Sequence, residues 1–196
     1  MKVFHSFDGF ELQSYTSSTD TNVIFSYDAD WGNTDSHFPY VYDYFSETLR
    51  ERQSFNQEFR AVSDSADFQK NIFFEWVIGT SYLELKESNL KKDDGLYGDP
   101  SDPYGPYASA SASSSKYKSS NFSVFGNLDY LLSASLKFSI GLRWEDWEAD
   151  YADSLQESFN PTDKMSGGKI SLIKNMTNDT NIYASLAKGY KQGGFN

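Results

Sequence analysis

Strict alternation of apolar and polar residues over 136–144 is the feature that most limits what this chain can fold into. The polar or small positions are Lys137, Ser139, Gly141 and Arg143, and the apolar positions between them are Leu136, Phe138, Ile140, Leu142 and Trp144. A β-strand turns successive side chains to opposite faces, whereas a helix would mix these two sets. The segment therefore predicts a strand whose apolar face meets lipid or a core. We expect the five apolar residues to face lipid, with Trp144 in an interfacial aromatic girdle.

The same period recurs along the chain and predicts three hairpins. The segment 121–130 alternates in the same way, with Phe125 as its one exception, and a short connection at 132–135 joins it to 136–144. The other two hairpins join 170–172 to 182–186 through 177–180, and 51–63 to 71–86 through 63–67. Phe10 to Tyr27 is interpreted as one long strand, with a hairpin break at Thr19–Asn22 as the alternative.

Longer polar stretches at about 28–50, 88–118 and 152–163 separate these hairpins, so short and long connections alternate. A transmembrane barrel has this asymmetry, because its periplasmic turns are tight and its outer loops are extended. The sequence thus predicts an all-β antiparallel meander of about seven or eight strands within a large transmembrane β-barrel, with short periplasmic turns and long extracellular loops. Within 88–118, a solvated loop is the simpler interpretation, and a ligand-facing loop carrying Tyr97, Tyr104 and Tyr107 is the functional one.

Composition supports a barrel and excludes several other classes. Only 38% of the 196 residues are hydrophobic while 17% are aromatic, as expected where one face of each strand meets lipid and the other meets water. The net charge of −11 argues against nucleic acid as a partner. The sequence contains no cysteine and no apolar run long enough for a transmembrane helix. Residues 1–6 lack the apolar region of a signal peptide, so we expect the natural N-terminus to lie upstream.

Charged pairs at strand spacing are the candidate functional residues. Glu58 with Arg60, and Arg143 with Glu145, are each two residues apart and are expected to face the lumen, as salt-bridged wall or as contacts for substrate. No catalytic, cofactor or metal site is predicted. His5 and His37 are the only histidines, and Asp28–Asn33 lacks the later glutamate of a calcium loop. We therefore expect a protein that is not an enzyme.

Four segments, in order, carry a family resemblance. They are NQEFR at 56–60, WVIGTSY at 76–82, GLRW at 141–144 and IYASLAKGYKQGGFN at 182–196. Together they resemble the barrel domain of TonB-dependent receptors, and the resemblance extends from about residue 9 to residue 196. The last segment is the most specific of the four.

The resemblance implies a barrel of roughly 22 strands, plugged by a separate domain through which the TonB system acts. Residues 1–196 would then be a partial barrel domain of a bacterial outer-membrane protein, without signal peptide, plug or C-terminal strands. Its partners would be outer-membrane lipid and, through the missing plug, the TonB system. The implied function is active uptake of a scarce nutrient such as a siderophore, cobalamin or an oligosaccharide. A soluble all-β ligand-binding module and a passive porin remain the alternatives.

Overall fold

A computed structural model describes residues 1–33, 35–66, 70–71, 73–177 and 179–193, which fold into one antiparallel sheet. The sheet has nine strands, ordered along the chain except that β7 pairs only with β6. This confirms the predicted antiparallel meander, with nine strands in place of seven or eight. The strands are β1 (Lys2–Phe7), β2 (Phe10–Asp28), β3 (Val41–Ser63), β4 (Phe74–Gly98), β5 (Tyr107–Ser133), β6 (Leu136–Asp153), β7 (Ser158–Phe159), β8 (Thr162–Thr177) and β9 (Thr180–Lys188).

Strands β2 to β5 contain 19, 23, 25 and 27 residues, against roughly 9–11 needed to cross a bilayer. Strand β2 confirms the long strand expected from Phe10 to Tyr27, whereas β3 to β5 are far longer than the sequence suggests. Of the stretches expected to be loops, most of 88–118 and nearly half of 28–50 are strand, which is a correction. In these outer parts of the strands both faces meet water, so the sequence does not alternate between apolar and polar residues. Backbone hydrogen bonds to the neighbouring strands still hold them in the sheet. The alternative break at Thr19–Asn22 is wrong, because β2 pairs with β3 without interruption from Phe10 to Asp28.

The two ends of the sheet differ in their connections. At one end, here called the short-turn end, Asp8–Gly9 and Ala134–Ser135 close β1–β2 and β5–β6. Gly9 has φ 88°, a conformation that side chains disfavour. At the other, the long-strand end, the connections at 29–40 and 99–106 lie beyond the membrane-length part of the strands. The β3–β4 connection runs over 64–73 at the short-turn end, and its residues 67–69 and 72 lie outside the described residues.

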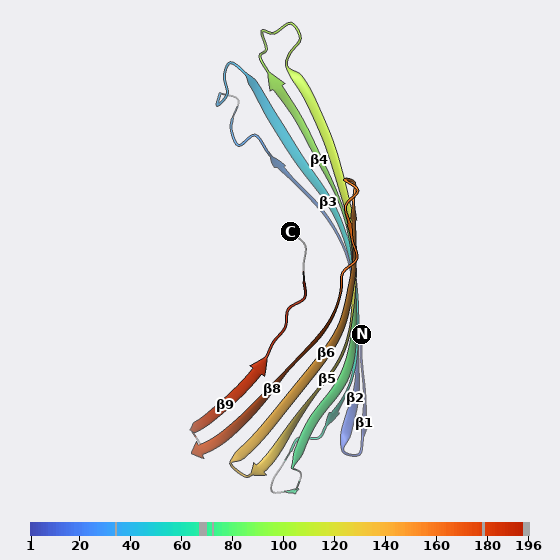
Figure 1. The fold of residues 1–196 in the computed structure, drawn as a ribbon, viewed down its shortest axis with the longest axis vertical. Helices are drawn as coiled ribbons and strands as arrows, with labels where there is room; N and C mark the ends of the chain where they lie inside the picture. The colour runs from blue at the N-terminus through green and yellow to red at the C-terminus, as the bar shows by residue number, and fades with distance from the viewer. Residues whose placement is uncertain (34, 67–69, 72, 178, 194–196) are drawn as a thin grey trace.

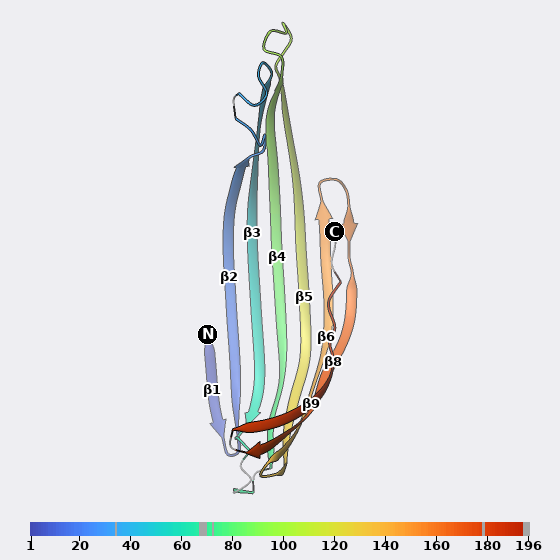
Figure 2. The same ribbon diagram turned by 90° about the vertical axis from the view of Figure 1, so that its left-hand side faces the viewer.

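The sheet is curved, and its two faces can be told apart. Figures 1 and 2 show the segment after β9 lying against the concave side. Tyr190 in that segment packs against Trp147 and Met165, so these two side chains point to the concave face. Directly opposed residues of neighbouring strands share a face, so the register then assigns each remaining strand residue to the concave or to the convex face. Strands β1 and β9 form the two edges, and they do not pair with each other.

The described residues bury almost no core. Trp147, Ala149 and Met165 form the only buried hydrophobic cluster among them, and no second layer covers either face of the sheet. None of the described segments is a helix with the length and apolar character needed to cross a bilayer. The residues that a soluble sandwich would bury between two sheets are therefore exposed here.

Candidate functional site

The convex face carries an apolar band across five strands near the short-turn end. The register places the five residues expected to face lipid on this face, opposite convex residues of β5 and β8. Ile78, Leu142 and Ile170, near the middle of the band, are 56%, 64% and 46% exposed. Contiguous exposed apolar surface of this kind marks an interaction with lipid or another apolar partner.

Aromatic side chains border this apolar band on both sides. Nearer the short-turn end, Phe74 stacks on Tyr130 with ring centroids 4.9 Å apart. On the opposite border, Phe122 meets Trp144 edge to face at 6.4 Å, and Tyr82 lies opposite Phe122 in the register. At about 3.4 Å per residue, Phe74 to Tyr82 spans about 27 Å, comparable with the apolar band about 25 Å tall of transmembrane barrels. Beyond it, the convex positions become charged, beginning with Glu84 and Lys86 on β4.

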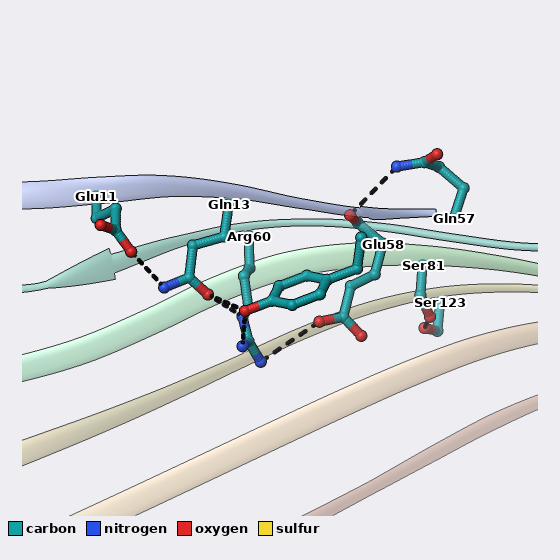
Figure 3. Close-up of polar contacts among 8 residues, drawn as sticks. Glu11, Gln13, Gln57, Glu58, Arg60, Ser81 and Ser123 are labelled. Carbon is teal, nitrogen blue, oxygen red and sulfur yellow. Dashed lines mark hydrogen bonds and ion pairs between the residues drawn. The ribbon is translucent and has the colours of Figure 1, made fainter. Parts of the chain in front are cut away.

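The concave face is polar at the same height, and a network around Arg60 dominates its β2–β3 part (Figure 3). Arg60 donates from Nε to Gln13 Oε1 at 2.6 Å and from Nη2 to the Tyr15 hydroxyl at 2.7 Å. Its Nη1 lies 3.4 Å from Glu58 Oε1, and its guanidinium lies 4.6 Å from the centre of the Tyr15 ring. Gln13 in turn donates to Glu11 at 2.7 Å. The network fixes the guanidinium, so this part of the wall is rigid and polar.

Phe125, the exception to the apolar alternation of 121–130, points to the concave face with its polar neighbours on β5, and Gly79 on β4 makes room there for its ring. A Cβ built on Gly79 would lie 2.6 Å from Phe125 Cζ, 2.9 Å from the Phe59 carbonyl oxygen and 3.0 Å from Arg60 Cβ. An aromatic ring that covers a cross-strand glycine is a known way of stabilising a sheet. The Arg143 guanidinium lies 5.6 Å from the centre of the same ring. Phe125 thus separates Arg60 from Arg143.

Glu145 and its neighbours continue the concave wall on β4 to β6. Arg143 Nε donates to Glu145 Oε1 at 2.5 Å, and Asn121 donates to Glu145 Oε2 at 3.4 Å. In the register row of Glu145 itself, the Ser81 and Ser123 hydroxyls share a hydrogen bond of 2.6 Å, with Ser123 fully buried. The four charged residues singled out in the sequence therefore lie on one face, in two separate ion pairs, both at the height of the apolar band.

A second concave network lies beyond the apolar band and was not found from the sequence. Arg52 donates from Nε to Glu87 Oε2 at 2.7 Å, and Arg50 donates from Nε to Asn89 Oδ1 at 2.9 Å. Asn89 donates to Glu87 Oε1 at 3.0 Å, which joins the four side chains. Partial burial raises the pKa of Glu87, but the hydrogen bonds from Asn89 and Arg52 and the two arginine charges outweigh it and lower this pKa below its usual value. Residues distant in sequence meet here, and only the strand register could have revealed them.

Aromatic side chains gather at the long-strand end of the concave face. Tyr97 and Tyr107 are opposed in the register, and Tyr42 contacts Tyr97 with ring centroids 6.0 Å apart. Tyr42 also lies against Tyr44 at 4.9 Å and His37 at 4.6 Å. Of the three tyrosines proposed as ligand-facing, the structure brings Tyr97 and Tyr107 together. It leaves Tyr104 apart and 84% exposed in the β4–β5 connection.

Among the described residues, no three histidine, aspartate or glutamate side chains converge as a metal site requires. The C-terminal segment leaves the sheet after Lys188, and residues 194–196 of the GGFN ending lie outside the described residues. What the described residues present is a wall with an apolar convex face and a polar, hydrogen-bonded concave face.

Comparison with solved structures shows where such walls occur. The ferric yersiniabactin uptake receptor FyuA from Yersinia pestis matches 100% of this chain with a TM-score of 0.66 and 17% identity. The siderophore receptor PiuA from Acinetobacter baumannii matches 95% with a TM-score of 0.63 and 13% identity. The ferric citrate transporter FecA matches 92% with a TM-score of 0.56 and 12% identity. At these identities the likeness concerns the fold, and the chain spans 28%, 31% and 25% of these proteins.

Comparison by sequence identifies the family. No curated protein matches the chain. The family model described as TonB dependent receptor-like, beta-barrel, matches residues 4–196, which is nearly the whole chain and includes all four segments that carried the resemblance. The chain belongs to the TonB-dependent receptor β-barrel family.

Proposed function

We propose that this chain forms part of the wall of an outer-membrane receptor that takes up a scarce nutrient with energy delivered through TonB. The observation that carries the proposal is the opposite chemistry of the two faces of one sheet. The convex face exposes an apolar band between aromatic borders, and at the same height the concave face holds the Arg60 and Glu145 networks. Lipid outside and a polar lumen inside account for both faces.

In this proposal the short-turn end faces the periplasm and the long-strand end faces the cell exterior. Extended outer strands then carry the tyrosines and the Arg50–Arg52 network towards arriving ligand. The open edges at β1 and β9 support a larger barrel, because unpaired strand edges are not tolerated in hydrocarbon. Solved relatives named for siderophore and ferric citrate transport support an uptake role, which belongs to the whole receptor. No catalytic role is proposed.

Cell fractionation tests the location. The chain would be expressed with an added signal peptide in a Gram-negative host, and its distribution among periplasm, inner membrane and outer membrane would be measured. We expect it in the outer-membrane fraction, released only by detergent, because the apolar band has no protein cover. Recovery as a soluble, folded monomer without detergent would contradict the proposal.

A further inference from the structure

The Arg50–Arg52 network beyond the apolar band has the geometry of an anion site. Arg50 and Arg52 are two residues apart on β3, so both side chains rise from the concave face. Their cross-strand partners on β4 are Asn89 and Glu87. Glu87 accepts from Arg52 and Asn89 and lies 3.7 Å from Arg50 Nε. One carboxylate thus orients two guanidinium groups.

The contacts leave part of this arginine pair available. They engage Nε of Arg50, and Nε and Nη2 of Arg52. Within the described part of the chain, no contact engages the terminal nitrogens of Arg50, and both arginine side chains are 49% exposed. On β2 the residues opposite Arg50 and Arg52 are the short Val23 and Thr21. On β5 the short Ser115 lies opposite Asn89, and the larger Tyr117 lies opposite Glu87. A ligand can therefore approach the guanidinium groups from the concave side.

Charge at this height makes the arginine pair distinctive. The residues at and beyond the register row of Arg52 and Glu87, which are 21–52, 87–117 and 151–159, hold 13 of the 28 acidic side chains but only five of the 17 lysines and arginines. The next concave cation, Lys91, is engaged by Asp93 at 2.8 Å. Two arginines against one glutamate leave a surplus positive charge in a strongly acidic region. Planar guanidinium groups favour carboxylate and phosphate oxygens, which they can bind through two parallel hydrogen bonds.

We propose that Arg50 and Arg52, positioned by Glu87, bind a carboxylate or phosphate group of the ligand on the concave wall outside the membrane. The site rests on the proposed function, because it requires this face to line the ligand's path. The acidic surroundings disfavour a ligand with a large net negative charge. The ligand class is therefore a molecule that presents an oxyanion group while its total charge stays near zero or positive.

Titration of the full chain in detergent micelles tests the site, with citrate and inorganic phosphate as probes and chloride at equal ionic strength as the reference. The readout is the NMR signal of the arginine Nε–H groups. We expect saturable shifts at Arg50 and Arg52. R50Q and R52Q should each weaken binding about tenfold or more, since each removes charge-assisted hydrogen bonds.

Two further variants separate a positioned site from diffuse attraction. Lys92 lies on the convex face of β4, three residues along the strand from Asn89, so K92Q removes an equal charge nearby and should change affinity less than about twofold. E87Q makes the region more positive but releases the arginines, so it should weaken binding. Stronger binding by E87Q, an equal loss in K92Q, or no saturable shift with either probe would overturn the site. Contact of the convex face with detergent, measured on the same samples, reports separately on the proposed function.

Discussion

Replacing Ile140 by arginine is expected to lower the free energy of unfolding in phospholipid vesicles by about 2–4 kcal/mol. Ile140 lies near the middle of the convex apolar band, opposite Leu128 and Ile170. A guanidinium there would have to leave water or distort the bilayer. Equilibrium unfolding in denaturant, followed by tryptophan fluorescence, measures the change.

The control is the neighbouring residue on the other face. Ser139 is concave and lies opposite Asp129, whose carboxylate already accepts from Lys137 at 2.9 Å. Ser139→Arg adds the same side chain one residue away, but towards water and a carboxylate, so its cost should be well below that of Ile140→Arg. Equal costs for the two variants would reverse the assignment of the faces.

Replacing Gly79 by alanine is expected to destabilise the sheet by about 1–3 kcal/mol, the usual cost of overpacking. The added methyl group would collide with the Phe125 ring and with the carbonyl oxygen of Phe59, and a backbone atom of a paired strand cannot move aside cheaply. The same unfolding measurement applies. Gly79→Ala combined with Phe125→Ala should recover only part of the loss, because the Phe59 contact remains.

Gly126 provides a matched control for the Gly79 variant. It lies on β5, and a Cβ there would meet only the Val77 carbonyl oxygen, at an ordinary distance of 3.4 Å. Alanine should be neutral or slightly stabilising at this position, since glycine weakens a strand interior. A Gly79→Ala variant as stable as Gly126→Ala would show that the Phe125 ring does not depend on the glycine.

The apolar band could be predicted from sequence because it depends on local alternation. Leu136 to Trp144 alternate without exception, and the register places them on one face as expected. The β5–β6 and β8–β9 hairpins follow from the same signal. Alternation also puts Phe125 on the polar face, but the residue that makes room for its ring there, Gly79, is 46 positions away and visible only through strand pairing.

The parts of the strands beyond the apolar band, and the side-chain contacts on them, could not be predicted from the sequence for a related reason. Where both faces of a strand meet water, Ser109 to Ser115 look like a loop although they pair residue by residue with β4. The Arg50–Glu87 and Tyr42–Tyr97 contacts join strands in a register that local patterns do not fix. The single pairs Glu58–Arg60 and Arg143–Glu145 were found because strand spacing alone brings their members to one face.

Quenching of tryptophan fluorescence by lipids with brominated acyl chains tests the central claim most directly. Trp144 is convex and 39% exposed, whereas Trp147 is concave and 5% exposed, although they are only three positions apart in the sequence. Variants that keep one tryptophan, with phenylalanine at the others, would be reconstituted in such lipid. We predict strong quenching of Trp144 and of the convex Trp76, and little quenching of Trp147 or of Trp31 in the β2–β3 connection. Quenching of Trp147 to the same extent as Trp144, or of neither, would contradict a wall with lipid on its convex face alone.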